Sequence, residues 1–585
     1  MYSPTPVAVK VLSSPNFVSR APLQRGFPVV LLALALVSFA FSPTLQAVNP
    51  APDGGYTNGN TAEGDFALLN LTTSGVNNTA LGYIALSRNT IGGYNTATGS
   101  SALGLNTTGN WNTANGYEAL YVNTNGSYNT ATGVQALYHN ITDNNTATGY
   151  RALYTNSTGG FNTANGFRAL YSNTTGGYNT ASGWHSLYSN TIGGSNTANG
   201  FGALLNNTTG SSNTANGFSA LLNNMTGQYN TASGYQALLS NNADGNTAIG
   251  YQALLNNTTG SSNTATGFDA LLNNTTGESN TATGFNALLD NTIGQANTAS
   301  GLSALQNNTT GNSNTATGFD ALGSNTSGGG NTATGVGALQ KSTTGPFNTA
   351  EGFQALQRNT TGSSNIAVGS NAGLSLTTGS SNVLVGANAG INLTTGSNNI
   401  DIGNQGVTGD AAKIRIGKQG TQTAAYMAGI YGKTVASGTK VGVMIDSTGK
   451  LGTIVSSARF KEAIKPMDKA SETLLALKPV TFRYKEELDP DGVPQFGLIA
   501  EEVEKVNPDL VVRDEDGKVN TVRYEAVNAM LLNEFLKEHG KIEEQAREIA
   551  QMKRQIESLT VSMRKASHRS ELGKNSRFPV LANDR

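Results

Sequence analysis

A seventeen-residue phrase recurs about twenty times in this chain, and it constrains the fold more than any other feature. The phrase reads approximately Asn-Thr-Ala-x-Gly-aromatic-x-Ala-Leu-x-x-Asn-Thr-Thr-Gly-x-x. Its first residue stands at Asn95 and Asn112 and recurs as far as Asn399. So short and regular a period is typical of stacked coils that contact mainly their neighbours. We therefore expect a β-rod over residues 60–403 and seek the chemistry of the chain outside it.

Within each coil, Thr-Ala-x alternates as a short strand does, and Asn and Gly supply corners because both tolerate positive φ. Each coil offers one Leu, two Ala and one aromatic residue for burial. Stacking places every residue above its equivalent, so we expect ladders of Asn, Thr and aromatic side chains. Because one coil buries so little apolar area, neighbouring chains are expected to pack their rods together. The Leu row includes Leu120, Leu170 and Leu204, and the aromatic row includes Tyr117, Phe167, Phe201, Phe218 and Phe268.

Composition excludes several classes of function. The net charge is −1, so no general attraction to nucleic acid is expected. The chain has no cysteine, and its four histidines are scattered, so neither a disulfide nor a metal site is predicted and no cofactor is expected. Charged residues are sparse in 60–403 and frequent in 456–585, which indicates a boundary between two kinds of structure.

The N-terminus has the pattern of a secretory signal peptide. Basic residues at Lys10, Arg20 and Arg25 precede an apolar run over 29–41, which is short for a membrane span. We predict a signal peptide over residues 1–47 and a linker over 48–59, so that the protein is secreted or displayed at the cell surface. The alternative is a membrane anchor formed by residues 29–41.

The final coils replace Thr with apolar residues. Asn365-Ile-Ala-Val-Gly369 and Asn382-Val-Leu-Val-Gly386 are examples. This pattern resembles the head repeats of trimeric autotransporter adhesins, which implies a parallel β-roll in a trimer. Residues 404–455 then alternate in short segments with Gly turns, which predicts a β stalk or neck. These segments are Ile414–Gly417, Ala425–Gly432 and Gly442–Asp446.

Several separate motifs follow in a fixed order. Together they resemble the intramolecular chaperone auto-processing domain found at the ends of phage tail spikes and endosialidases, here placed at residues 456–530. The resemblance implies a domain that trimerises, guides folding of the β-fibre before it and then cuts itself off. The motifs are Ser456-Ser-Ala-Arg-Phe-Lys461, Leu477–Tyr484, Phe496–Val503, Pro508–Val511 and Val522–Tyr524.

The family motif Ser-Asp-x-Arg-x-Lys assigns roles to individual residues. The resemblance implies Ser456 as nucleophile, Lys461 as base, Arg459 as the motif arginine, and cleavage between Val455 and Ser456. Ser457 stands where the family has Asp. A serine hydroxyl needs a base, and a lysine serves only when burial or a positive neighbour, such as Arg459, lowers its pKa. Taken alone, the Ser and Lys also fit a helix N-cap followed by an exposed lysine.

The tail carries heptads over 531–563. An Ile-rich first position favours three strands, so we predict a trimeric coiled coil that holds three chains in register. Residues 564–585 are expected to be disordered. The predicted core positions are Phe535, Ile542, Ile549, Ile556 and Met563.

The predicted fold is mainly β: a trimeric β-roll or solenoid rod, a short β stalk, and an α+β auto-processing domain ending in a coiled coil. The predicted function is a secreted or surface homotrimeric fibre of the adhesin kind, with a glycan or another cell-surface molecule as ligand. Its predicted peptidase activity is a single self-cleavage by a Ser/Lys pair, with no external substrate. The alternatives are a phage or prophage tail fibre with the same domain, and an ice- or polysaccharide-binding solenoid suggested by the Thr rows.

Overall fold

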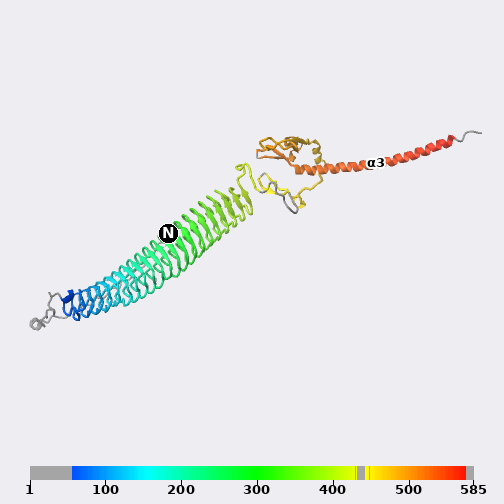
Figure 1. The fold of residues 1–585 in the computed structure, drawn as a ribbon. Helices are drawn as coiled ribbons and strands as arrows, with labels where there is room; N and C mark the ends of the chain where they lie inside the picture. The colour runs from blue at the N-terminus through cyan, green and yellow to red at the C-terminus, as the bar shows by residue number, and fades with distance from the viewer. Residues whose placement is uncertain (1–55, 429, 431–441, 447, 515, 575–585) are drawn as a thin grey trace, which may run out of the picture. The chain divides into compact units, whose positions relative to one another are not determined.

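The computed structural model describes residues 56–428, 430, 442–446, 448–514 and 516–574 (Figure 1). The chain divides into two compact units, residues 1–418 and 419–585. The predicted signal peptide or anchor and most of the predicted linker lie outside the described residues. Among the helices of the described ranges, none is both long enough and apolar enough to cross a membrane.

The first unit is a β-solenoid, which confirms the predicted rod. One sheet of 22 strands runs along it, and each strand pairs in parallel with the next in the sequence. A short 3-10 turn, Thr57–Gly59, precedes the first strand. The strands are β1 Thr61–Glu63, β2 Thr79–Leu81, β3 Thr96–Thr98, β4 Thr113–Asn115, β5 Thr130–Thr132, β6 Thr146–Thr148, β7 Thr163–Asn165, β8 Thr180–Ser182, β9 Thr197–Asn199, β10 Thr214–Asn216, β11 Thr231–Ser233, β12 Thr247–Ile249, β13 Thr264–Thr266, β14 Thr281–Thr283, β15 Thr298–Ser300, β16 Thr315–Thr317, β17 Thr332–Thr334, β18 Thr349–Glu351, β19 Ile366–Val368, β20 Val383–Val385, β21 Ile400–Ile402 and β22 Ile414–Ile416.

The core of each coil is small and partly polar. The central Ala of the strand, the Ala of the following turn and the Leu after it are buried, as Ala114, Ala119 and Leu120 illustrate. The Thr residues that flank the central Ala point outward, as in β5. The Leu row lies in the left-handed region, with φ between 48° and 54°. That conformation costs about 1–2 kcal/mol per residue, which burial of a Leu side chain, worth about 1.5–3 kcal/mol, offsets.

Two rows of buried Asn form the predicted ladders. Asn112 accepts at Oδ1 from the backbone N–H of Asn129 (3.0 Å), and its Nδ2 donates to the carbonyl of Gly126 (2.8 Å). In the second row, Nδ2 of Asn123 donates to Oδ1 of Asn106 (3.0 Å) and to the carbonyl of Gly126 (2.8 Å). Burying an amide without a hydrogen-bond partner costs free energy, so the Asn side chains of each coil depend on the next coil for their hydrogen bonds.

The aromatic row corrects the sequence expectation. Aromatic residues were expected in the interior of the coil, but Tyr117, Phe167 and Phe201 are 49 %, 39 % and 44 % exposed. From Tyr150 to Phe285 the rings of this row stack along the outside of the rod, as the 5.0 Å between the ring centres of Phe201 and Phe218 illustrates. Ala, Leu and Asn fill the interior, and no aromatic ring of the repeat is needed there.

The C-terminal end of the rod has a different core. Leu376 and Leu393 stand where earlier coils have buried Asn, while Gly373 and Gly390 stand in the Leu row. The side chain of Leu384 fills the space beside both glycines. In these coils the apolar side chains therefore come from other positions of the repeat, but they fill the same core.

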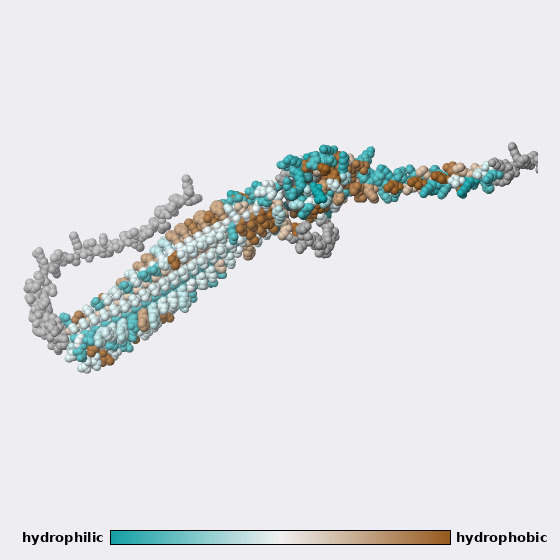
Figure 2. Space-filling view, turned by 45° about the horizontal axis from the view of Figure 1, so that its top comes forward, coloured by the Kyte–Doolittle hydropathy of each residue, from teal (hydrophilic) through white to brown (hydrophobic). Residues whose placement is uncertain are grey.

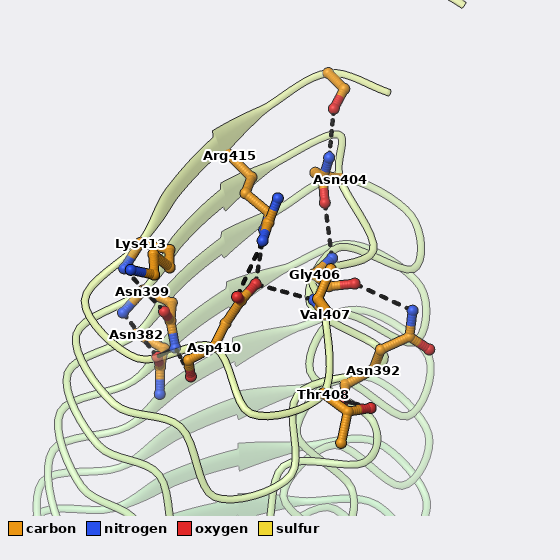
Figure 3. A network of polar contacts seen from close by, with 11 residues as sticks. Asn382, Asn392, Asn399, Asn404, Gly406, Val407, Thr408, Asp410, Lys413 and Arg415 are labelled. Carbon is orange, nitrogen blue, oxygen red and sulfur yellow. Dashed lines mark hydrogen bonds and ion pairs between the residues drawn. The ribbon is translucent and has the colours of Figure 1, made fainter. Parts of the chain in front are cut away.

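The rod continues one coil beyond residue 403, where its end was predicted. β22 pairs with β21, so Ile414–Ile416 belongs to the rod and not to a separate stalk. A polar network closes this last coil (Figure 3). Asp410 accepts from Nε and Nη2 of Arg415 at 2.6 and 3.0 Å, and from the backbone N–H of Val407 at 3.0 Å. The hydrogen bond from Arg415 is the main reason why the pKa of Asp410 lies below its ordinary value.

Asp401 occupies the buried row that Ala fills in most coils. It is 1 % exposed, and neither carboxylate oxygen has a hydrogen-bond partner among the described residues. Burial and, second, the charge of Asp410 raise the pKa of Asp401 to about 6, although Arg415 opposes the shift. A carboxyl whose pKa is raised by folding destabilises the fold once it ionises.

Asp401→Asn is therefore expected to stabilise the end of the rod at pH 7. The folded rod binds a proton at Asp401 that the unfolded chain has lost, so stability falls as pH rises from about 4 to about 6. The variant should lose this dependence and gain on the order of 2–3 kcal/mol of local stability at neutral pH. The check is the hydrogen-exchange protection factor of the amides of Ile400 and Ile402, measured at pH 4.5 and at pH 7.

Asp410→Asn is the control and should loosen the same coil, because it removes the carboxylate that accepts from Arg415. Equal protection factors in wild type at both pH values would contradict the expectation.

The second unit is α+β. Its strands form three short antiparallel pairs: β23 (Met444–Ile445) with β24 (Leu451–Gly452), β25 (Val480–Phe482) with β26 (Gln495–Gly497), and β27 (Val511–Arg513) with β28 (Val519–Val522). The described residues of this unit also form three 3-10 segments and two helices: η2 (Ala458–Phe460), η3 (Asp468–Ala476), η4 (Pro508–Leu510), α2 (Ala500–Val506) and α3 (Tyr524–Lys574). Its buried core consists of Val503, Leu510, Val522 and Met530.

In this unit the structure differs from two of the boundaries that the sequence predicted. The predicted stalk segment Ala425–Gly432 has no strand in its described residues, and residues 429 and 431–441 lie outside them. The third predicted segment contains β23. At the other end, α3 continues to Lys574, so the first part of the tail predicted as disordered is helical. The remaining residues, 575–585, lie outside the described ranges.

Candidate functional site

The structure brings Ser456 and Lys461 together. The chain turns at η2, where the N–H groups of Phe460 and Lys461 donate to the carbonyls of Ser457 (3.1 Å) and Ala458 (3.0 Å). This turn places Nζ of Lys461 3.4 Å from Oγ of Ser456. The distance is long for a hydrogen bond, as catalytic contacts often are before the reacting geometry is complete. The catalytic roles of both residues stay predictions.

Arg459 contacts an aromatic neighbour in the turn. Its guanidinium lies over the ring of Phe460, with Cζ 4.6 Å from the ring centre. This cation–π contact stabilises the turn that separates Ser456 from Lys461. In the single chain, Arg459 is thus a residue that shapes the turn. Its predicted effect on Lys461 stays a prediction.

The site is open to solvent in one chain. Ser456 and Lys461 are both exposed, and Val455, before the predicted scissile bond, is 55 % exposed. A lysine accepts a proton only through a neutral amine, a form that burial favours. Among the described residues of the single chain, none covers Lys461.

The separate motifs of the domain meet in space. The hydroxyl of Tyr524 accepts a hydrogen bond from the backbone N–H of Leu498 (3.0 Å). Nη1 of Arg523 donates to the carbonyl of Asp509 (3.1 Å). The motifs around Phe496, Pro508 and Val522 are therefore parts of one fold, as their joint occurrence in the sequence indicated.

A polar cluster that sequence reasoning missed fastens η3 to α3. Ser471 is fully buried, and its Oγ donates to Oε1 of Glu534 and accepts from Nδ2 of Asn533 at 2.6 Å. Nζ of Lys537 donates to Oε1 of Glu534 (2.7 Å), which is the main cause of the lowered pKa of Glu534. No spacing in the sequence connects Ser471 with residues some sixty positions later, so only the fold reveals this contact.

The second unit exposes many large apolar side chains. Phe496 is 83 % exposed and Leu475 is 79 % exposed, and the buried core of the unit contains only a few residues. The predicted core positions of the coiled coil all lie on α3, and all are exposed in the single chain. Seven-residue spacing keeps them on nearly the same side of the helix. Their exposed fractions are 65 % for Phe535, 60 % for Ile542, 49 % for Ile549, 61 % for Ile556 and 68 % for Met563.

Comparison with known families agrees with this geometry. Residues 456–512 match the model of a family described as chaperone of endosialidase, Peptidase_S74. The match begins at Ser456, the predicted nucleophile, which confirms the resemblance drawn from the sequence. No curated protein matches the chain. The chain thus has, C-terminal to a long parallel β-solenoid, a segment that is similar to this chaperone and peptidase family.

Proposed function

We propose that this chain is a secreted or surface homotrimeric fibre whose C-terminal domain aligns three chains and then cuts itself off between Val455 and Ser456. The observation that carries the proposal is the pairing of Ser456 with Lys461 at the first residues of the family match. The domain follows the solenoid unit in the chain, so cleavage separates the two. The rod is the product, and its exposed ladders offer a long surface for a glycan or another cell-surface ligand.

The proposed chemistry uses only groups at this turn. Neutral Nζ of Lys461 takes the proton of the Ser456 hydroxyl, and Oγ attacks the carbonyl carbon of Val455, the residue before it. The C–N bond breaks as the protonated lysine returns the proton to the leaving amine, which leaves an ester between Val455 and Ser456. Water then hydrolyses the ester. The products are a carboxylate at Val455 and an amine at Ser456.

Assembly into a trimer would cover apolar surface that is exposed in the single chain. The exposed apolar residues of the domain need partners, because a soluble monomer rarely leaves so many uncovered. Three copies of α3, packed through the Ile-rich heptads, would bury them and hold the chains parallel. The same packing would place a neighbouring domain over Ser456 and Lys461, so that the pair is covered only in the trimer. Cleavage is therefore expected to follow trimerisation.

Expression of the full chain in a host with a secretory route tests the proposal. We expect two products whose intact masses place the cut between Val455 and Ser456. Sedimentation velocity should show the rod product with the mass of three copies. A folded sample that remains one full-length species would contradict self-cleavage, and monomeric full-length chains would contradict the trimer.

A further inference from the structure

We infer that the rods of the trimer pack against one another through one continuous apolar row, which faces the shared axis. This inference rests on the proposed trimer and adds the surface that holds it. The row, called here the aromatic stripe, consists of the residues that follow the strand glycines. Its members are Tyr117, Val134, Tyr150, Phe167, Trp184, Phe201, Phe218, Tyr235, Tyr251, Phe268, Phe285, Leu302, Phe319, Val336 and Phe353.

The aromatic stripe is exposed without a break. Each coil from Tyr117 to Phe353 contributes one residue, and their exposed fractions lie between 37 % and 51 %. Figure 2 shows apolar residues along an edge of the rod. At roughly half of the 150–250 Å² that an aromatic side chain can bury, the stripe offers on the order of 1,000 Å². This exceeds the few hundred Å² that a monomer usually leaves exposed and is near the roughly 800 Å² per partner of a stable interface.

The stacking of the rings limits which kinds of surface can pack against the aromatic stripe. Ring centres of Phe201 and Phe218 lie 5.0 Å apart with planes 6° from parallel, and Tyr235 and Tyr251 lie 5.1 Å apart at 7°. Neighbouring rings thus occupy the flat faces, and the stripe presents ring edges. A flat ligand would need the faces, whereas an apolar surface with side chains at the same spacing can interdigitate with the edges.

A second copy of the same rod has that spacing. The stripe advances one residue per coil, or about 4.8 Å. A parallel copy keeps this register over the whole length, whereas a surface of another period falls out of step after a few coils. The neighbouring row supplies a polar rim, as in other interfaces, with Nε2 of Gln252 donating to Oε1 of Gln236 at 2.9 Å. Few charges interrupt the rod. The exceptions beside the stripe are Arg151 and Arg168, whose guanidinium groups lie 5.2 and 5.3 Å from the ring centres of Tyr150 and Phe167.

A second aromatic row on the rod provides a matched control. It occupies the corner before the lead Asn and includes Trp111, Phe161, Tyr178 and Tyr229, which are 51–68 % exposed. Serines such as Ser195 and Ser212 interrupt it, so it forms no continuous surface. Changes in this corner row remove comparable apolar area and leave the stripe intact.

The first test compares Phe201→Ser/Phe218→Ser/Phe268→Ser/Phe285→Ser with Trp111→Ser/Phe161→Ser/Tyr178→Ser/Tyr229→Ser, both in the full chain. After cleavage, sedimentation velocity should show wild-type and corner-variant rods as trimers and the stripe-variant rod as a monomer, a threefold loss of mass. Circular dichroism checks that all rods are folded. A trimeric stripe-variant rod, or a wild-type rod that is monomeric once released, would overturn the inference while self-cleavage stands.

Cross-linking tests the inference without large changes in the stripe. The chain has no cysteine, so Phe268→Cys and Tyr229→Cys each introduce one thiol. Both are made in the uncleavable Ser456→Ala chain and treated with a short bis-maleimide. We expect covalent dimers at position 268, because identical residues meet near the axis, and only monomer at position 229. Trimeric chains that do not cross-link at 268 would reject the stripe and leave the proposed trimer intact, whereas monomeric chains would reject the trimer itself.

Discussion

Ser456→Ala is expected to leave the chain at full length. The change removes the hydroxyl that is proposed to attack the carbonyl of Val455 and that lies beside Nζ of Lys461. Lys461→Met should have the same result, because it keeps most of the length of the side chain but removes the base that lies 3.4 Å from Oγ. Loss of a nucleophile or its base lowers a rate by at least about 10²–10⁴-fold. Intact mass measured over time in assembled samples checks both variants.

The same turn offers controls for the cleavage variants. Ser457→Ala retains the backbone carbonyl that accepts from Phe460, and Lys465→Met removes a nearby exposed charge. Both should cleave within a few-fold of wild type, and all four variants should assemble equally. Release from Ser456→Ala at the wild-type rate would show that the nucleophile lies elsewhere.

The second large effect is expected within the rod, at Gly217→Ala. The backbone of Gly217 has φ of 142°, and a Cβ there would lie 2.3 Å from the carbonyl oxygen of Gly234 in the next coil. The backbone at Gly217 cannot move away from Gly234 without loss, because its N–H donates a hydrogen bond to the carbonyl of Asn199 at 2.8 Å. Backbone strain and broken pairing together should cost about 3–5 kcal/mol. Limited proteolysis should cut the variant near coil 217 at temperatures where wild type resists.

Gly202→Ser is the matched control in the neighbouring coil. Gly202 also has positive φ, 63°, but a Cβ there meets its nearest atom at 3.7 Å. The next coil already has Ser219 at the equivalent position, with φ of 54°. The variant should therefore stay within about 0.5 kcal/mol of wild type. Equal protease resistance of the two variants would show that stacked coils separate more easily than the ladders indicate.

The sequence determined the parts of this protein that depend on local pattern. The seventeen-residue period and the Thr-Ala-x alternation located the strands and the Asn ladders, because stacking repeats the local environment of each residue. The order of motifs from Ser456 to Tyr524 identified the C-terminal domain, and seven-residue spacing located the apolar side of α3. Each of these signals is complete within a short stretch of chain.

Only the tertiary structure decided which side of a coil faces inward. Hydrophobicity alone placed the aromatic row inside, but the coil that is closed by left-handed turns at residues such as Leu120 buries Ala, Leu and Asn and leaves the rings outside. The buried charge of Asp401 and the contact of Ser471 with Glu534 likewise depend on segments that meet only after folding. The surface of aromatic edges, from which the assembly of the rod is inferred, follows from that closure and not from composition.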